Sequence, residues 1–225
     1  GKDWASNCSR SSTDSKQDCN TRLMKFYFDG CSYTYGSELK NPEQTRFSKL
    51  LSDKYDAVEI NRASHGSSNK GILRRVLLEA DISQYDLVVV NLTAPSRTEY
   101  WDVNKGWRKV NVSKFIGKVE NEHTQFWRYY LTNIYTEEEG NTNERIAYES
   151  IKNLCKVHNV PLIITTIRTQ KMKELHRLGH TVYSSLEFDL NLGDSKYPRY
   201  ERFHPTEEGH QMIASDLAKI YESLL

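Results

Sequence analysis

Two short segments of this chain carry the residue types that nucleophilic catalysis uses. Residues 30–36 (Gly-Cys-Ser-Tyr-Thr-Tyr-Gly) place Ser32 just after an aromatic run, and the later segment Glu-Arg-Phe-His-Pro places Glu201 three positions before His204. A serine hydroxyl becomes a nucleophile when a neighbouring base takes its proton. A carboxylate bound to one imidazole nitrogen leaves the other nitrogen free to act as that base. The pattern predicts Ser32 as nucleophile, His204 as base and Glu201 as the acid that orients the base.

Each segment also has a simpler interpretation when it is considered alone. Small residues after a strand are common in ordinary turns, and a loop histidine is usually a surface residue. The combination of Ser32 with the Glu201–His204 spacing favours catalysis over these alternatives. His210 falls inside the helix that follows and is expected to cap or to pack rather than to react.

Alternating elements are expected to place the two segments at one edge of a sheet. Aromatic and β-branched runs predict strands, and apolar residues at helical spacing predict helices. The first half of the chain is interpreted as strand 25–29, helix 45–54, strand 57–61, helix 69–80 and strand 86–92. This alternation is typical of an α/β fold with a mostly parallel sheet and helices on both faces. Ligands bind at the carboxyl ends of such strands, and Ser32 follows the first of them.

The second half of the chain resumes this alternation after an interruption. Residues 97–125 fit no regular element and are expected to form an insertion over one end of the sheet. The elements expected after it are helices 126–135 and 143–158, strand 161–166, a helical stretch 171–178, a weak fifth strand 181–186 and a final helix 206–224. One domain over residues 24–225 is the simplest organisation. Residues 1–23 are expected to be either a flexible N-terminal extension or a non-native segment, with translation beginning at Met24.

Composition and charge exclude several classes of protein. The formal net charge is +1 without a cluster of Lys and Arg, which argues against nucleic acid as a partner. No apolar run approaches the roughly 20 residues that a membrane-spanning helix needs, and no signal peptide is recognisable. The four cysteines are expected to be free thiols in a reducing compartment, with a Cys8–Cys19 disulfide as the alternative in a secreted protein. These features predict a cytoplasmic protein without a membrane partner.

Both segments resemble sequence blocks of one known family. Residues 30–36 are similar to the first block of the SGNH hydrolases, also called the GDSL-type esterase/lipase superfamily, which reads Gly-Asp-Ser-x-Thr-x-Gly. Residues 201–205 resemble the last block, Asp-x-x-His-Pro, and are followed by the Gly-His pair that accompanies it. The resemblance extends over residues 25–225. It implies a flavodoxin-like three-layer α/β/α sandwich with a mostly parallel five-stranded sheet.

The resemblance also implies which groups stabilise the negative charge of a reaction intermediate. A glycine of the family's second block donates its N–H to the oxyanion hole, and Gly66 is the corresponding residue here. The N–H of Ser32 is the other implied donor. This chain departs from the family at Cys31 and Glu201, which both stand where the family has Asp. Cys31 is expected to be a small buried residue behind the nucleophile.

The match fails at the third block of the family, Gly-x-Asn-Asp. The corresponding stretch reads Thr-Ala-Pro-Ser-Arg and contains no asparagine for the oxyanion hole. Arg97 is the first candidate to replace that donor, ahead of Ser96 and Asn69. Two other roles for Arg97 stay open: it binds a carboxylate or phosphate of the substrate, or it pairs with Glu99 or Glu201.

The aromatic residues of the insertion bear on the choice of substrate. Tyr100 and Trp101 either form a surface on which a sugar stacks or pack the insertion onto the sheet. We expect hydrolysis of a carboxylic ester through an acyl-enzyme at Ser32, with a small O-acyl group on a carbohydrate favoured over a long lipid. The alternatives are an acyltransferase of the same fold, or a catalytically impaired module that binds a carbohydrate or another ligand. The expected partner is a small-molecule or carbohydrate ester, and no metal or organic cofactor is implied.

Overall fold

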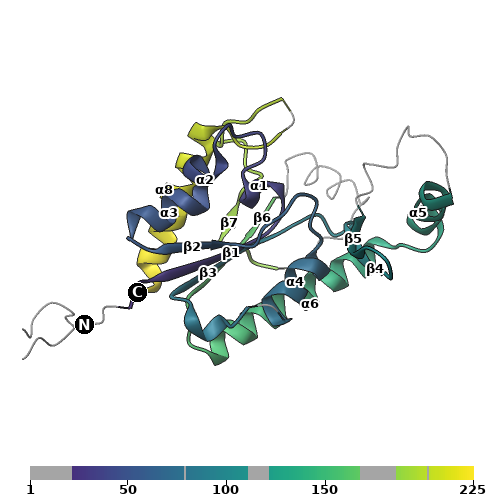
Figure 1. Ribbon diagram of the computed structural model, residues 1–225, viewed down its shortest axis with the longest axis horizontal. Coiled ribbons are helices and arrows are strands. Elements are labelled where there is room, and N and C mark those ends of the chain that lie inside the picture. The colour runs from purple at the N-terminus through teal and green to yellow at the C-terminus, as the bar shows by residue number, and fades with distance from the viewer. Residues whose placement is uncertain (1–21, 79, 111–121, 168–185, 202) are drawn as a thin grey trace, which may run out of the picture.

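A five-stranded parallel sheet forms the centre of the molecule in the computed structural model, which describes residues 22–78, 80–110, 122–167, 186–201 and 203–225 (Figure 1). Its strands are β1 (Lys25–Asp29), β2 (Val58–Asn61), β3 (Leu87–Leu92), β6 (Leu162–Thr166) and β7 (Leu190–Asn191). They pair in the order β2-β1-β3-β6-β7, and every pair is parallel. The strand order is that of flavodoxin-like proteins, so the expected fold is confirmed.

Helices cover both faces of this sheet. Helices α3 (Phe47–Lys54) and α8 (Glu207–Leu224) lie on one face, and α4 (Asn69–Leu78) and α6 (Glu137–Val157) lie on the other (Figure 1). Successive side chains of a strand point to opposite faces. In β1, Phe26 and Phe28 therefore join the core beneath α3 and α8, whereas Tyr27 joins the core beneath α4 and α6. Both faces are apolar, which explains why β3 is buried along its whole length and is apolar except for Asn91.

The start of α8 also fixes the start of α3. The Thr206 side chain accepts the Gly209 N–H at 3.1 Å and caps α8, and His210 Nδ1 accepts the Phe47 N–H at 3.1 Å at the start of α3. The His210 ring is fully buried and stacks on Phe47. Burial lowers the pKa of His210 to about 4, so the imidazole is neutral at neutral pH. The expectation that His210 caps and packs is confirmed.

The stretch that fits no element from sequence contains a β-hairpin. Strands β4 (Thr98–Asp102) and β5 (Gly106–Val110) pair in antiparallel fashion, and α5 (Glu122–Asn133) follows at the far side of the hairpin (Figure 1). Gly106 has a φ of +69° at the turn, a conformation that glycine adopts without strain. The hairpin packs on α4, where the side chains of Arg74 and Glu99 pair at 2.9 Å.

The remaining short elements are α1 (Ser32–Tyr35), α2 (Pro42–Thr45) and a 3₁₀ turn η1 (Ile82–Gln84). The expected helix 171–178 and most of the expected strand 181–186 fall outside the described residues, as do residues 1–21; the fifth strand that the structure describes is β7. Among the helices that are described, none combines the length and apolar character needed to cross a membrane.

Candidate active site

Ser32 lies in a tightly packed turn at the carboxyl end of β1. It is the first residue of α1 and is 9% exposed. A Cβ atom on Gly30 would lie 2.4 Å from Thr34 Oγ1 and 2.8 Å from the Asn91 side chain of β3. Only glycine permits this approach, because real Cβ contacts do not fall below 3.0 Å. The Gly-x-Ser-x-Thr spacing thus follows from how closely the turn packs on the neighbouring strand.

A buried ion pair beneath the turn holds it in place. Asp29, the last residue of β1, is fully buried and accepts two hydrogen bonds from Arg75 of α4, at 2.9 and 2.6 Å. Asp29 also accepts the Gly30 N–H at 2.6 Å. Burial raises the pKa of the Asp29 carboxyl, and the bonds from Arg75 and Gly30 oppose that increase. The two-point contact with Arg75 fixes the end of β1 from which Ser32 projects.

A tight loop before α8 brings His204 to the same end of the sheet. Arg199 and Pro205 form an antiparallel bridge, and the Tyr200 N–H donates to the His204 carbonyl at 2.9 Å. Tyr33, the residue after Ser32, donates its hydroxyl to the Phe203 carbonyl at 2.6 Å. The rings of Tyr33 and His204 are 5.6 Å apart between centroids. This hydrogen bond and this ring contact tie the His204 loop to the turn that carries Ser32.

Glu38 is the carboxylate that contacts His204. Its Oε2 lies 2.5 Å from His204 Nδ1, and the two side chains are 25% and 22% exposed. Glu38 has a φ of +72° and Phe203 has a φ of +71°, so strained backbone lies on both sides of this contact. A carboxylate on Nδ1 fixes the tautomer in which Nε2 is available as a base.

The contact expected between Glu201 and His204 is not present in the structure. The Phe203 N–H donates to the Tyr200 carbonyl at 2.9 Å, which closes a tight turn over this part of the loop. Glu201 lies in that turn with its side chain exposed, and it makes no hydrogen bond or ion pair within the described residues. The turn directs Glu201 to solvent, and Glu38 occupies the Nδ1 side of the imidazole.

The loop after β2 places Gly66 beside the Ser32 turn. The Ser64 N–H donates to the Gly30 carbonyl at 3.2 Å, and His65 Nδ1 lies 2.7 Å from the Ser37 hydroxyl. Gly66 has a φ of +67°, and a Cβ atom there would have no neighbour within 4 Å. Within the described part of the chain, the N–H groups of Gly66 and Ser32 donate no hydrogen bond. Two unused backbone donors therefore lie on adjoining loops, with open space at Gly66.

The stretch after β3 contains Arg97, and hydrogen bonds with the Asn69 side chain fix its backbone. Asn69 accepts the Thr93 N–H at 2.7 Å and donates to the Thr93 carbonyl at 3.0 Å, so its amide serves the backbone. Arg97 Nη1 donates to the Thr93 hydroxyl at 2.6 Å. Glu99, one of the two partners considered for Arg97, pairs instead with Arg74 at 2.9 Å. Ser96 is half-buried in the same turn.

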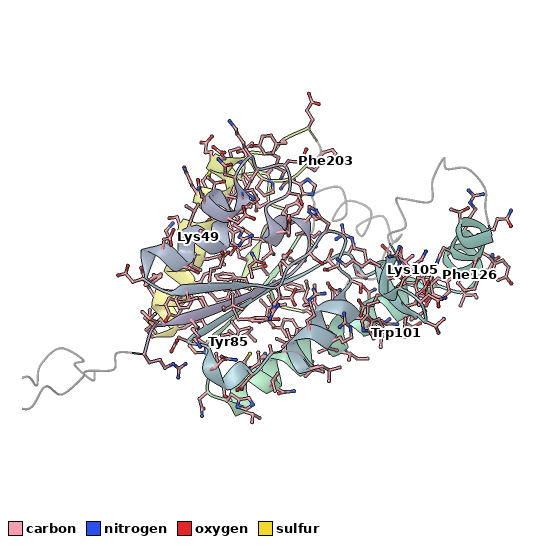
Figure 2. All side chains as sticks on the ribbon, in the orientation of Figure 1. Lys49, Tyr85, Trp101, Lys105, Phe126 and Phe203 are labelled. Atoms are coloured by element: carbon pink, nitrogen blue, oxygen red, sulfur yellow. The ribbon has the colours of Figure 1, made fainter. Side chains whose placement is uncertain are left out.

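The two aromatic residues predicted to bind substrate differ in their surroundings. Tyr100 packs against Trp127 of α5 with 5.2 Å between ring centroids. Trp101 is 59% exposed and makes an edge-to-face contact with Trp107 across the hairpin. Figure 2 shows Trp101 on the hairpin, well separated from Phe203 in the loop of His204. The structure thus brings Trp101 together with Trp107 rather than with the His204 loop.

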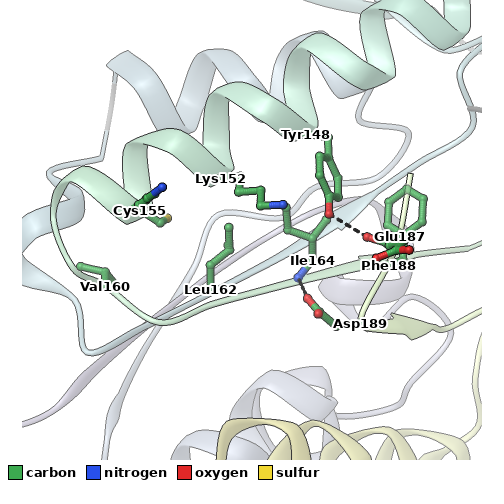
Figure 3. Close-up of a pocket in the computed structure, with 10 residues that line it drawn as sticks. Tyr148, Lys152, Cys155, Val160, Leu162, Ile164, Glu187, Phe188 and Asp189 are labelled. Atoms are coloured by element: carbon green, nitrogen blue, oxygen red, sulfur yellow. Dashed lines mark hydrogen bonds between the residues drawn. The ribbon is translucent and has the colours of Figure 1, made fainter. Parts of the chain in front are cut away.

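A separate groove of about 580 Å³ lies between α6, β6 and residues 187–189 (Figure 3). The Tyr148 hydroxyl donates to the Glu187 carbonyl at 2.7 Å across it, and burial raises the pKa of Cys155 in its wall to about 11. None of the predicted site residues lines it. Elsewhere in the described part of the chain, no group of three or more His, Cys, Asp or Glu side chains is arranged to hold a metal ion.

Known structures share this architecture over most of the chain. A protein of the G-D-S-L family from Desulfitobacterium hafniense superposes with a TM-score of 0.50 at 9% identity, covering 88% of this chain and 99% of its own. A lipase from a goat rumen metagenome gives a TM-score of 0.51 at 10% identity, covering 88% of this chain and 97% of its own. The chain has the SGNH-hydrolase fold. No protein-family model matches its sequence, and no curated protein matches it either.

In this SGNH fold, four residues of the site region were not predicted from sequence. Glu38 lies 166 positions from His204, and no local pattern marks it as a partner. Arg199 is half-buried beside the His204 loop. In the sequence it is one arginine in a polar stretch, and no pattern distinguishes it from an exposed residue. The Asp29–Arg75 pair could have been predicted in part, because an Asp at the end of an apolar strand requires a cationic partner when it is buried.

Proposed function

We propose that this protein hydrolyses a carboxylic ester through an acyl-enzyme at Ser32. The observation that carries the proposal is the convergence of three distant segments: the Ser32 turn, the Gly66 loop and the His204 loop. Direct hydrogen bonds join them, from Ser64 to Gly30 and from Tyr33 to Phe203. Nucleophile, oxyanion donors and base are the groups that acyl transfer requires at one place.

In the proposed reaction, His204 Nε2 takes the proton of the Ser32 hydroxyl as its oxygen attacks the ester carbonyl. The N–H groups of Ser32 and Gly66 then donate to the oxyanion of the tetrahedral intermediate. The protonated His204 gives its proton to the leaving alcohol. A water molecule then gives a proton to His204 as it attacks the acyl carbonyl, and His204 passes that proton to Ser32 Oγ when the acyl–oxygen bond breaks and the acid leaves.

We assign the orienting role to Glu38 in place of Glu201. The 2.5 Å contact between Glu38 Oε2 and His204 Nδ1 supports this assignment. The exposed position of Glu201 argues against a stable contact between its carboxylate and the His204 imidazole. A carboxylate on Nδ1 also stabilises the imidazolium that forms when His204 accepts the proton.

We propose a polar, carbohydrate-like alcohol as the other part of the ester. Trp101 presents an exposed aromatic surface on the hairpin, on which a sugar ring can stack, whereas the Arg74 guanidinium lies over the ring of Trp107. Lys109 connects this hairpin to the Gly66 loop, because its ammonium donates to the His65 carbonyl at 3.0 Å. Tyr100 contributes less to such a surface since it is packed on Trp127.

Turnover of p-nitrophenyl acetate tests the proposed reaction. Ser32→Ala and His204→Ala should each lower kcat by about 10³-fold or more, because the remaining groups bind the ester without a nucleophile or a base. Glu38→Gln should lower kcat far more than Glu201→Gln does. Equal turnover by Ser32→Ala and the unaltered protein would exclude the acyl-enzyme. A larger loss in Glu201→Gln than in Glu38→Gln would return the orienting role to Glu201.

A further inference from the structure

Two arginines near Ser32 have no carboxylate partner among the residues that the structure describes. Arg97 Nη1 donates to the Thr93 hydroxyl at 2.6 Å, and Arg199 Nη2 donates to the Asp194 backbone carbonyl at 2.5 Å. Neither arginine forms an ion pair within the described residues. Arg199 Nε is buried and has no hydrogen-bond partner there. Arginine has five N–H donors, so each of these two guanidinium groups retains unused donors.

Both arginines lie on loops that border the Ser32 turn. Arg97 follows β3, which pairs directly with β1, and its partner Thr93 comes immediately after β3. Arg199 is bridged to Pro205, the residue after His204. Burial raises the pKa of the Tyr33 hydroxyl, and the positive charges of Arg199 and Arg97 oppose this increase. The two cations thus act on the same side chain, which directly follows Ser32.

Three acidic groups in this region already have partners, and a fourth, Glu201, is exposed to solvent. Glu38 contacts His204, Asp29 binds Arg75 and Glu99 binds Arg74. Within the described residues, none of these carboxylates contacts Arg97 or Arg199. Partly buried charges are normally compensated by a group of opposite sign, because desolvation is costly. A bound ligand with a negative charge would supply that compensation.

We propose that Arg97 and Arg199 together bind an anionic group, a carboxylate or a phosphate, on the substrate that is cleaved at Ser32. This inference rests on the proposed esterase function and specifies its substrate class. It assigns Arg97 to substrate binding in place of the missing third oxyanion donor. The planar fork of a guanidinium suits both anions, since each presents two oxygens to parallel N–H donors.

Matched esters that differ in charge test the proposal. The probes are 4-acetoxybenzoate, its neutral analogue 4-acetoxybenzamide, and 4-acetoxyphenyl phosphate, assayed with the unaltered protein, Arg97→Gln and Arg199→Gln. Arg145→Gln is the matched control, because Arg145 is exposed on α6. Charge-assisted hydrogen bonds predict that kcat/KM is about 10- to 100-fold higher for an anionic ester than for the amide. Comparison of the two anionic esters identifies which anion the site prefers.

The ratio of anionic to neutral kcat/KM is the decisive quantity. It should fall about tenfold or more in Arg97→Gln and in Arg199→Gln, and it should keep its value in Arg145→Gln. Activity toward the neutral ester shows that each variant is folded. A ratio near one in the unaltered protein, or a ratio that neither arginine variant changes, would overturn the proposal. An equal loss for charged and neutral esters in Arg97→Gln would instead assign that residue to the oxyanion hole.

Binding without turnover separates this inference from the esterase function. Calorimetric titration of the unaltered protein with 4-hydroxybenzoate should show binding that 4-hydroxybenzamide lacks and that both arginine variants lose. This result would support the anion site even if no ester were hydrolysed. Turnover of all three esters at equal efficiency, without 4-hydroxybenzoate binding, would leave the esterase function standing and refute the anion site.

Discussion

Acidification should destabilise this protein through His210. The imidazole is fully buried, and burial, with a smaller effect of nearby His204, lowers its pKa from 6.5 to about 4. Between about pH 6.5 and about pH 4 the unfolded chain binds a proton at this position that the folded protein excludes. The free energy of unfolding therefore falls as the pH is lowered through that window. The loss is roughly 3 kcal/mol once the window is crossed, and about 2 kcal/mol of it occurs between neutral pH and about pH 5.

The variant His210→Asn isolates this effect. Asparagine places its Oδ1 near the position of His210 Nδ1, so it can still accept the Phe47 N–H, but it does not titrate. Urea unfolding near pH 7 and near pH 5 should show that the unaltered protein loses about 2 kcal/mol more than the variant does. His158→Asn, at an exposed position, controls for the loss of one imidazole. An equal loss in His210→Asn and the unaltered protein would refute the assignment.

Three further substitutions test how the site is supported. Gly30→Ala should cost about 1–3 kcal/mol of stability because its Cβ would lie 2.4 Å from Thr34 Oγ1, and thermal unfolding should show a smaller cost in a Thr34→Ala background. Asp29→Asn should cost about 3–5 kcal/mol, measured by urea unfolding, because it leaves the Arg75 charge buried without its partner; a cost below about 1 kcal/mol would contradict the ion-pair account. Tyr33→Phe removes the hydrogen bond to Phe203, so kcat for p-nitrophenyl acetate should fall while thermal unfolding shifts by about 1 kcal/mol or less; an unchanged kcat would show that this bond does not position His204.

The sheet was predictable because its signals are local. Strands 25–29, 86–92 and 161–166 are short apolar runs, and their observed bounds differ from the expected ones by one residue at most. Ser32 follows strand 25–29 and Gly66 follows the second strand, β2, so the fold itself places both residues at the carboxyl edge of the sheet. The hairpin could also have been predicted, because a strand-like aromatic run precedes residues 102–106 (Asp-Val-Asn-Lys-Gly), which contain the turn-forming residues Asp, Asn and Gly.

The partner of His204 was not predictable in the same way. Spacing alone favours Glu201, three residues away, but the turn around Phe203 directs it to solvent. Glu38 contacts the imidazole from a backbone with a positive φ, which is uncommon for a residue with a side chain. A contact between residues 166 positions apart leaves no periodic pattern in the sequence.

Covalent labelling of Ser32 tests the central claim most directly. A fluorophosphonate probe reacts with a serine that a neighbouring base activates, and peptide mass spectrometry locates the adduct. We predict one adduct on Ser32 in the unaltered protein, a strongly reduced rate of labelling in His204→Ala, and no adduct at this position in Ser32→Ala. An unlabelled Ser32 in protein that is folded by circular dichroism, or labelling at the same rate without His204, would contradict the account.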